Sequence, residues 1–127
     1  LAEMIVDNSG GAVSVRGNDG KTRADMGLIP NGGVIRVQGN DGKTGVVMSR
    51  IGPFGGVSVM GRDGEDRAKM SIGPYGGDVI ILGNDGKPRV GMGVDPNGGT
   101  VSVLGNDGKK RVVMGVDSTN SGFINKF

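Results

Sequence analysis

The sequence contains no histidine and no cysteine. Histidine is the commonest general base in enzymes, cysteine is the usual thiol nucleophile, and the two supply most transition-metal ligands. We therefore expect a protein that is not an enzyme, with no catalytic residue, no cofactor or cofactor-binding residue and no metal ligand. The lack of cysteine also excludes a disulfide framework and leaves the redox compartment open.

Bulky side chains are scarce as well. Tryptophan is absent, aromatic residues make up 3% of the chain, and 28 of its 127 residues are glycine. Such a chain has little with which to fill a compact core, and it lacks the aromatic platforms on which nucleic-acid bases stack. The formal net charge of +2, from 15 basic and 13 acidic residues, is too small to indicate a polyanion binder. We expect no nucleic-acid partner.

Long apolar runs are missing too, so no segment is expected to insert in a membrane. No signal peptide is evident, and Leu1 is not a translation start. We expect an excerpt or a processed chain, and these features leave its localisation open.

What the sequence does contain is one short element repeated in tandem, clearest at residues 98–114, GGTVSVLGNDGKKRVVM. The tripeptide Asn106-Asp107-Gly108 recurs upstream in steps of 22 residues, as Asn-Asp-Gly at positions 84, 40 and 18 and as Arg-Asp-Gly at position 62. Methionine keeps the same step at Met114, Met92, Met70, Met48, Met26 and Met4, and only Met60 lies outside it. A period of this length indicates a repeat architecture.

We interpret residues 1–127 as a single repeat array. It comprises a partial repeat at 1–9, full repeats at 10–31, 32–54, 55–75, 76–97 and 98–120, and a partial repeat at 121–127. The two partial repeats are in phase to complete one another, which leaves a head-to-tail filament subunit as one alternative function. Asn125 counts against this alternative, because the 22-residue step places it where the pattern requires an apolar residue.

Within each repeat the apolar residues alternate with polar or small ones, which is typical of a half-buried β-strand and not of a helix. In the last full repeat, the first strand carries Val101 and Val103 and the second carries Val112 and Met114. Arg50 interrupts the apolar face, and a β-bulge would let Ile51 replace it there. We expect an all-β chain without helices.

The stretch Gly-Asn-Asp-Gly-Lys between the two strands is rich in residues that tolerate a left-handed backbone. A two-residue turn at Asp107-Gly108 sets Val103 opposite Val112 and Val101 opposite Met114, with all apolar side chains on one face. A three-residue turn would set Val103 opposite Arg111, whereas a four-residue loop would keep the apolar register. The register is therefore predicted, and the turn type stays open.

The second connection in each repeat contains proline. In Asp95-Pro96-Asn97-Gly98, proline and glycine stand where a type I turn followed by a left-handed residue requires them. The corresponding segments are Ile29-Pro30-Asn31-Gly32, Gly52-Pro53-Phe54-Gly55 and Gly73-Pro74-Tyr75-Gly76.

A lone two-stranded hairpin is marginal in water, so the apolar face needs a cover from adjacent repeats, from other chains or from both. A β-solenoid or β-roll would stack equivalent residues about 4.8 Å apart. It would bring the aspartates of successive loops together, which is unfavourable. Antiparallel hairpins that wrap their faces around an axis shared with other chains keep those charges apart.

The order of these features resembles the triple β-spiral shafts of adenovirus-type fibres, reovirus attachment proteins and bacteriophage tail fibres. The residues concerned are Gly73-Pro74, then Val79-Ile80-Ile81, the loop Asp85-Gly86-Lys87, and Val90-Gly91-Met92. The resemblance covers nearly the whole chain, although the repeats here are longer and carry a glycine pair after the turn. It implies an elongated homotrimer serving as a stiff structural stalk, in a virion or at an extracellular or cell surface, with an unknown receptor.

Three other features of the repeats could in principle bind phosphate, metal or solvent. Gly20-Lys21-Thr22 does not fit a phosphate-binding loop, because Val15 stands where the loop requires glycine. The methionine column, whose thioethers could bind Cu(I), is interpreted as core packing because it alternates with valine. The basic residues beside each loop are interpreted as a solvated face.

The loop aspartates leave a further alternative open, a monomeric β-solenoid adhesin or a calcium-stabilised binding module. The chain lacks the G-G-x-G-x-D motif of calcium-binding β-rolls. The preferred interpretation is a structural shaft segment.

Overall fold

The computed structural model describes residues 1–8, 10–51 and 53–127, and these residues form β-strands without any helix. The strands are β1 (Ala2–Asp7), β2 (Gly10–Arg16), β3 (Thr22–Ile29), β4 (Gly32–Gln38), β5 (Thr44–Ile51), β6 (Phe54–Met60), β7 (Asp66–Gly73), β8 (Gly76–Leu82), β9 (Pro88–Asp95), β10 (Gly98–Leu104), β11 (Lys110–Val116) and β12 (Gly122–Lys126). In this part of the chain, no helix is long and apolar enough to cross a membrane. The chain divides into a first unit, Leu1–Glu65, and a second unit, Asp66–Phe127.

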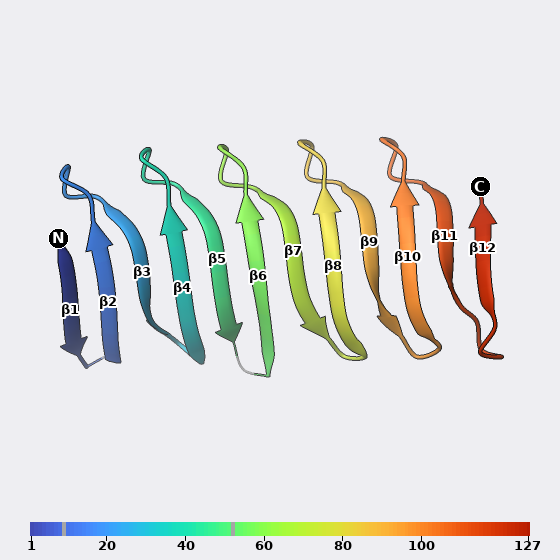
Figure 1. Ribbon diagram of the computed structural model, residues 1–127, viewed down its shortest axis with the longest axis horizontal. Helices are drawn as coiled ribbons and strands as arrows, with labels where there is room; N and C mark the ends of the chain where they lie inside the picture. The colour runs from blue at the N-terminus through green and yellow to red at the C-terminus, as the bar shows by residue number, and fades with distance from the viewer. Residues whose placement is uncertain (9, 52) are drawn as a thin grey trace. The chain divides into compact units, whose positions relative to one another are not determined.

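Each unit is an antiparallel sheet whose strands lie side by side in chain order, β1 to β6 in the first and β7 to β12 in the second (Figure 1). The Gly-Asn-Asp-Gly loops lie at one end of the strands and the second connections at the other. The prediction of an all-β chain of repeated hairpins is confirmed.

The solenoid alternative does not describe either sheet. Met26 in β3 and Met48 in β5 occupy equivalent repeat positions, and Ile35 of β4 lies between them as the partner of both. Equivalent residues are therefore two strands apart, about 9.5 Å, and not stacked directly at about 4.8 Å.

The predicted register is confirmed. Val103 lies opposite Val112 and Val101 lies opposite Met114, and the first hairpin repeats this with Val13 opposite Met26. Residues directly opposite in an antiparallel pair share a face, so the apolar side chains of each hairpin lie together.

The turn type at Asp107-Gly108, which the sequence left open, is neither the two-residue turn nor the four-residue loop. The Gly108 N–H donates to the Gly105 carbonyl at 2.9 Å and the Gly105 N–H donates to the Lys109 carbonyl at 2.8 Å, so Asn106, Asp107 and Gly108 form a three-residue loop. Gly108 has a φ of 77°, as the last residue of such a loop requires.

A β-bulge compensates for the odd number of residues in this loop. Leu104 pairs with Lys110 whereas Val103 pairs with Val112, so Arg111 is the extra residue on its strand. The same shift occurs at the equivalent loops of β2–β3, β4–β5 and β8–β9. The bulge returns the valines to one face, which a three-residue turn alone would not do.

The second connections that join β3 to β4, β7 to β8 and β9 to β10 are two-residue turns of more than one kind. Asp95 pairs with Gly98, and its carboxylate Oδ1 accepts the Asn97 N–H at 2.8 Å and the Gly98 N–H at 3.1 Å. Gly98 has a φ of 144°, in line with the prediction of a positive value, whereas in the turn at Pro30 it is Asn31 that has a positive φ, 73°. Gly52 in the turn at Pro53 lies outside the described residues.

Two further predictions concerned interruptions of the apolar face. Arg50 lies opposite Gly33 and Gly55 in a regular ladder, so the predicted bulge is absent there, and the side chain of Ile51 lies outside the description. The position of Asn125 was also predicted wrongly. Ile124 pairs with Met114 and Asn125 pairs with Val113, because the last connection is one residue longer than the 22-residue step allows.

Candidate functional site

One face of each sheet is almost entirely apolar, and we call it the methionine face. In the first unit it comprises Ala2, Met4, Val6, Val13, Val15, Ala24, Met26, Leu28, Ile35, Val37, Val46, Met48, Val57 and Val59. In the second unit it comprises Ala68, Met70, Ile72, Val79, Ile81, Val90, Met92, Val94, Val101, Val103, Val112, Met114, Val116 and Ile124. Arg50 in the first unit and Lys126 in the second bring a charge to this face.

The methionine face is uncovered. Met48 is 50% exposed and Met92 is 49% exposed, and the methionines at the other repeat positions range from 43% to 76%. Among the described residues, the buried hydrophobic core consists of Val34 alone, at 6% exposure. Val34 lies on the opposite face of the first unit, since its partners are Gly27 and Ser49. Neighbouring strands within a unit therefore leave this face exposed, and the prediction that other chains cover it stays a prediction.

The methionine face is not flat, because glycine and bulky residues alternate along one row of it. In the second unit, Ile72 lies opposite Gly77 and Val94 lies opposite Gly99. An open hollow of about 430 Å³ lies over these glycines, bordered by Met70 and Met92. In the first unit, a second hollow of about 430 Å³ is lined by Gly11, Gly33, Met26 and Met48 among others.

The opposite face carries most of the cross-strand polar contacts, and we call it the serine face. Arg36 donates to Asp25 at 3.2 Å across β3 and β4. The Ser71 hydroxyl donates to the Asp78 carboxylate across β7 and β8. These groups find partners within their own sheet, so the serine face has less need of a cover.

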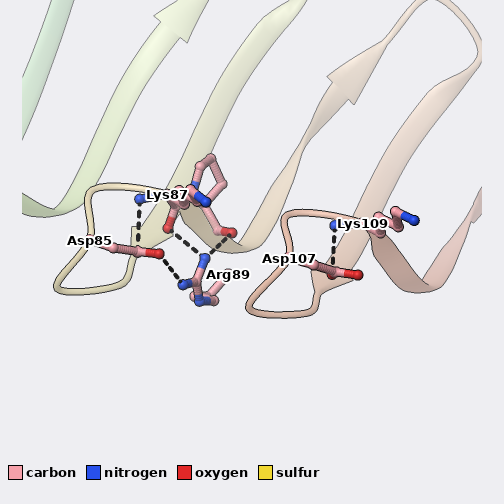
Figure 2. A network of polar contacts seen from close by, with 6 residues as sticks. Asp85, Lys87, Arg89, Asp107 and Lys109 are labelled. Atoms are coloured by element: carbon pink, nitrogen blue, oxygen red, sulfur yellow. Dashed lines mark hydrogen bonds and ion pairs between the residues drawn. The ribbon is translucent and has the colours of Figure 1, made fainter.

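The loop aspartates use their carboxylates within their own hairpins (Figure 2). Asp85 Oδ1 accepts the Lys87 N–H at 3.2 Å, and Asp85 Oδ2 accepts from Arg89 Nη2 at 2.8 Å. The same pair of contacts joins Asp107 to Lys109 and Arg111, and Asp19 to Lys21 and Arg23. The arginine of each pair occupies the bulge position, so the bulge directs its guanidinium over the loop.

These contacts favour the ionised carboxylate. The Lys21 N–H, followed by the Arg23 guanidinium, lowers the pKa of Asp19 below its ordinary value of 3.8. For Asp85 the hydrogen bond from Arg89 is the larger cause of the lowered pKa, and the Lys87 N–H is the smaller one. The pKa of Asp107 is lowered mainly by the Lys109 N–H and further by Arg111.

Asp117 plays a related part in the last connection. Its carboxylate Oδ1 accepts the Thr119 hydroxyl at 2.6 Å, the Thr119 N–H at 2.9 Å and the Ser121 N–H at 3.0 Å. The pKa of Asp117 is lowered, first by the Thr119 hydroxyl and then by the Ser121 and Thr119 backbone.

The basic residues beside the loops, which we interpret as a solvated face, include exposed lysines such as Lys21 and Lys87, and two arginines are less exposed than these. The Arg23 and Arg89 side chains are only 23% and 22% exposed, because each lies along its own loop against an aspartate. Sequence reasoning missed this Asp–Arg pair, although the spacing of four residues between the two positions was visible in the repeat. Within the ranges that the structure describes, no group of three acidic side chains could hold a metal ion.

No family model and no curated protein matches this chain. The candidate site therefore rests on geometry alone, and the methionine face is its most extensive feature.

Proposed function

We propose that this chain is a structural segment of a fibre or surface appendage, and that it self-associates, as a homotrimer, by covering its methionine faces. In this assembly the repeats supply length, and the loop charges remain in solvent. An extracellular or virion location is part of the proposal. The chain performs no reaction of its own.

The observation that carries the proposal is the exposed surface of the single chain. A compact monomer of 12.9 kDa exposes about 6,300 Å², whereas this chain exposes 8496 Å². The excess, about 2,200 Å², exceeds the roughly 1,600 Å² that one chain would bury in two standard interfaces. The proposed trimer, in which each chain contacts two others, would bury surface of this order.

The experiment places a charge on the methionine face. The variant Met48→Glu with Met92→Glu carries one carboxylate in each unit at a position that the proposal covers. Burying an unpaired carboxylate is strongly unfavourable, so we expect this variant to run as a single chain in size-exclusion chromatography with light scattering.

The matched control is Ser58→Glu with Ser102→Glu, which adds the same charges to the serine face in β6 and β10. We expect the control to keep the mass of the unmodified assembly. If the methionine-face variant and the unmodified chain have the same mass, the proposed interface is wrong.

A further inference from the structure

The glycine-floored hollows of the methionine face have no explanation within a single chain. Gly99 lies in a regular part of β10, opposite Val94, and a Cβ built there meets nothing within 4 Å. Its neighbour Gly98 differs, because it has a φ of 144° and a Cβ there would lie 3.1 Å from the Val116 Cβ. The fold therefore requires glycine at position 98 and not at position 99.

The same holds for the other hollow-lining glycines whose cross-strand partners lie on the methionine face. A Cβ at Gly33 or Gly77 would come no closer than 3.8 Å to another atom, and at Gly11 no closer than 4.0 Å. Glycine weakens the interior of a strand, and where no bulge or bend explains it, it often marks the close approach of another group. Both hollows are open and lined mainly by apolar side chains, with Arg50 at the edge of the one in the first unit, so the group that fits them best is apolar.

We propose that methionine side chains of a second copy of this chain occupy these hollows. This inference rests on the proposed function, since it requires self-association, and it adds the mode of packing. The exposed surface of the single chain is large enough to bury against another copy, and the repeat supplies the fit. The methionines recur on every second strand, and so do the glycines that floor the hollows. One face therefore carries protruding side chains and glycine positions at the same spacing of about 9.5 Å.

Methionine suits this role because its unbranched thioether adapts to irregular gaps. When the methionines of one copy occupy the hollows of another, the strands of the two copies can align in one register only, or in registers that differ from it by whole repeats. A displacement by one strand would set each methionine against the bulky residue that alternates with glycine in the same row, such as Val94, and leave the hollows empty, which forfeits packing contacts.

The experiment fills the hollows with the variant Gly33→Val and Gly99→Val, one substitution in each unit. Valine favours strands, so the secondary structure of the variant should be kept, as judged by circular dichroism. Because overpacking opposes close docking, we expect the dissociation constant of the assembly to rise by roughly tenfold or more. The control is Ser58→Val with Ser102→Val, which adds the same side chain to the serine face and should leave the dissociation constant unchanged.

A second experiment identifies which residues of two copies touch, and it does not depend on how tightly the copies bind. The chain is produced with a photo-reactive methionine analogue, mixed with an isotopically labelled copy and irradiated. We expect crosslinks between copies from the methionine column to residues bordering the hollows, such as Val94 and Val101.

The outcomes separate the two proposals. An unmodified chain that is monomeric removes both the proposed function and this inference. If the unmodified chain assembles and the filled variant assembles equally well, or if the crosslinks lie elsewhere, self-association stands and methionine-in-hollow packing is overturned.

Discussion

The loop aspartate and the bulge arginine show how single residues contribute to each hairpin. Asp107 closes its loop through the Lys109 N–H, and Arg111 covers the second carboxylate oxygen at 2.8 Å. The arginine therefore compensates for the negative charge that the turn requires. Because both groups lie in solvent, each pair alone contributes little to stability, and the effect depends on repetition along the chain.

Lowered carboxylate pKa values predict that the protein loses stability in acid. Asp19, Asp85, Asp107 and Asp117 have pKa values below 3.8 in the folded chain, so the folded state binds fewer protons than the unfolded state. The stabilisation is fully present above the ordinary pKa, and it is lost as the pH falls below 3.8 through the lowered values. Thermal unfolding followed by circular dichroism between pH 7 and about pH 2 checks this.

A variant with asparagine at all four positions provides the control for this titration. Its thermal midpoint should be lower at neutral pH and should fall less in acid. Equal losses in the two proteins would assign the acid dependence to other groups.

One hairpin offers a natural comparison, because Gly45 stands at the bulge position that arginine occupies in the hairpins of Arg23, Arg89 and Arg111. A Cβ at Gly45 would lie 3.7 Å from the nearest atom, the Val37 carbonyl oxygen, which is an ordinary contact. Gly45→Arg should therefore stabilise the chain by about 0.5–1 kcal/mol from reduced backbone entropy, with a further small gain from pairing with Asp41.

Thermal melting at fixed chain concentration measures this effect, and Gly45→Ala separates the backbone contribution from the ion pair. A midpoint for Gly45→Arg at or below that of the unmodified chain would contradict the expected pairing.

At the scale of the elements, the strand pairing could be predicted from the sequence. Only one register brings Val101, Val103, Val112 and Met114 to the same face, and the structure adopts it. The strand pairing therefore follows from placing the apolar side chains on one face, and it does not depend on the type of loop.

The loop geometry could not be predicted by the same reasoning. A three-residue loop with a bulge at Arg111 gives the same apolar register as a two-residue turn, so the apolar pattern does not distinguish them. The last connection was missed for a related reason. That connection is one residue longer than the 22-residue step allows, and Asn120 adopts the left-handed conformation in it, with a φ of 63°. The extra residue places Ile124, and not Asn125, in the apolar row.

The first glycine of each pair supports a prediction at this scale. Gly98→Ala should destabilise the turn between β9 and β10 by roughly 1–3 kcal/mol, because alanine would be strained at a φ of 144° and would crowd Val116. Thermal unfolding of the full chain measures the change. Gly45→Ala, at a position without positive φ or crowding, is the matched control, and equal midpoints for the two variants would count against this explanation.

At the scale of the whole molecule, the chain makes sheets but almost no core. The described residues bury Val34 and leave the methionines of each sheet 43% to 76% exposed. Exposed apolar surface of this extent marks an interaction site. The sequence indicated that a cover was required. Apolar periodicity has the same form whether that cover comes from two chains or from three, so the proposed number of chains comes from the resemblance to fibre shafts.

The mass of the unmodified chain in solution tests the central claim most directly. Native mass spectrometry or sedimentation velocity at micromolar concentration should show a species of three chains, three times 12.9 kDa. A single species of 12.9 kDa at every concentration would show that the methionine faces remain uncovered, and would contradict the account.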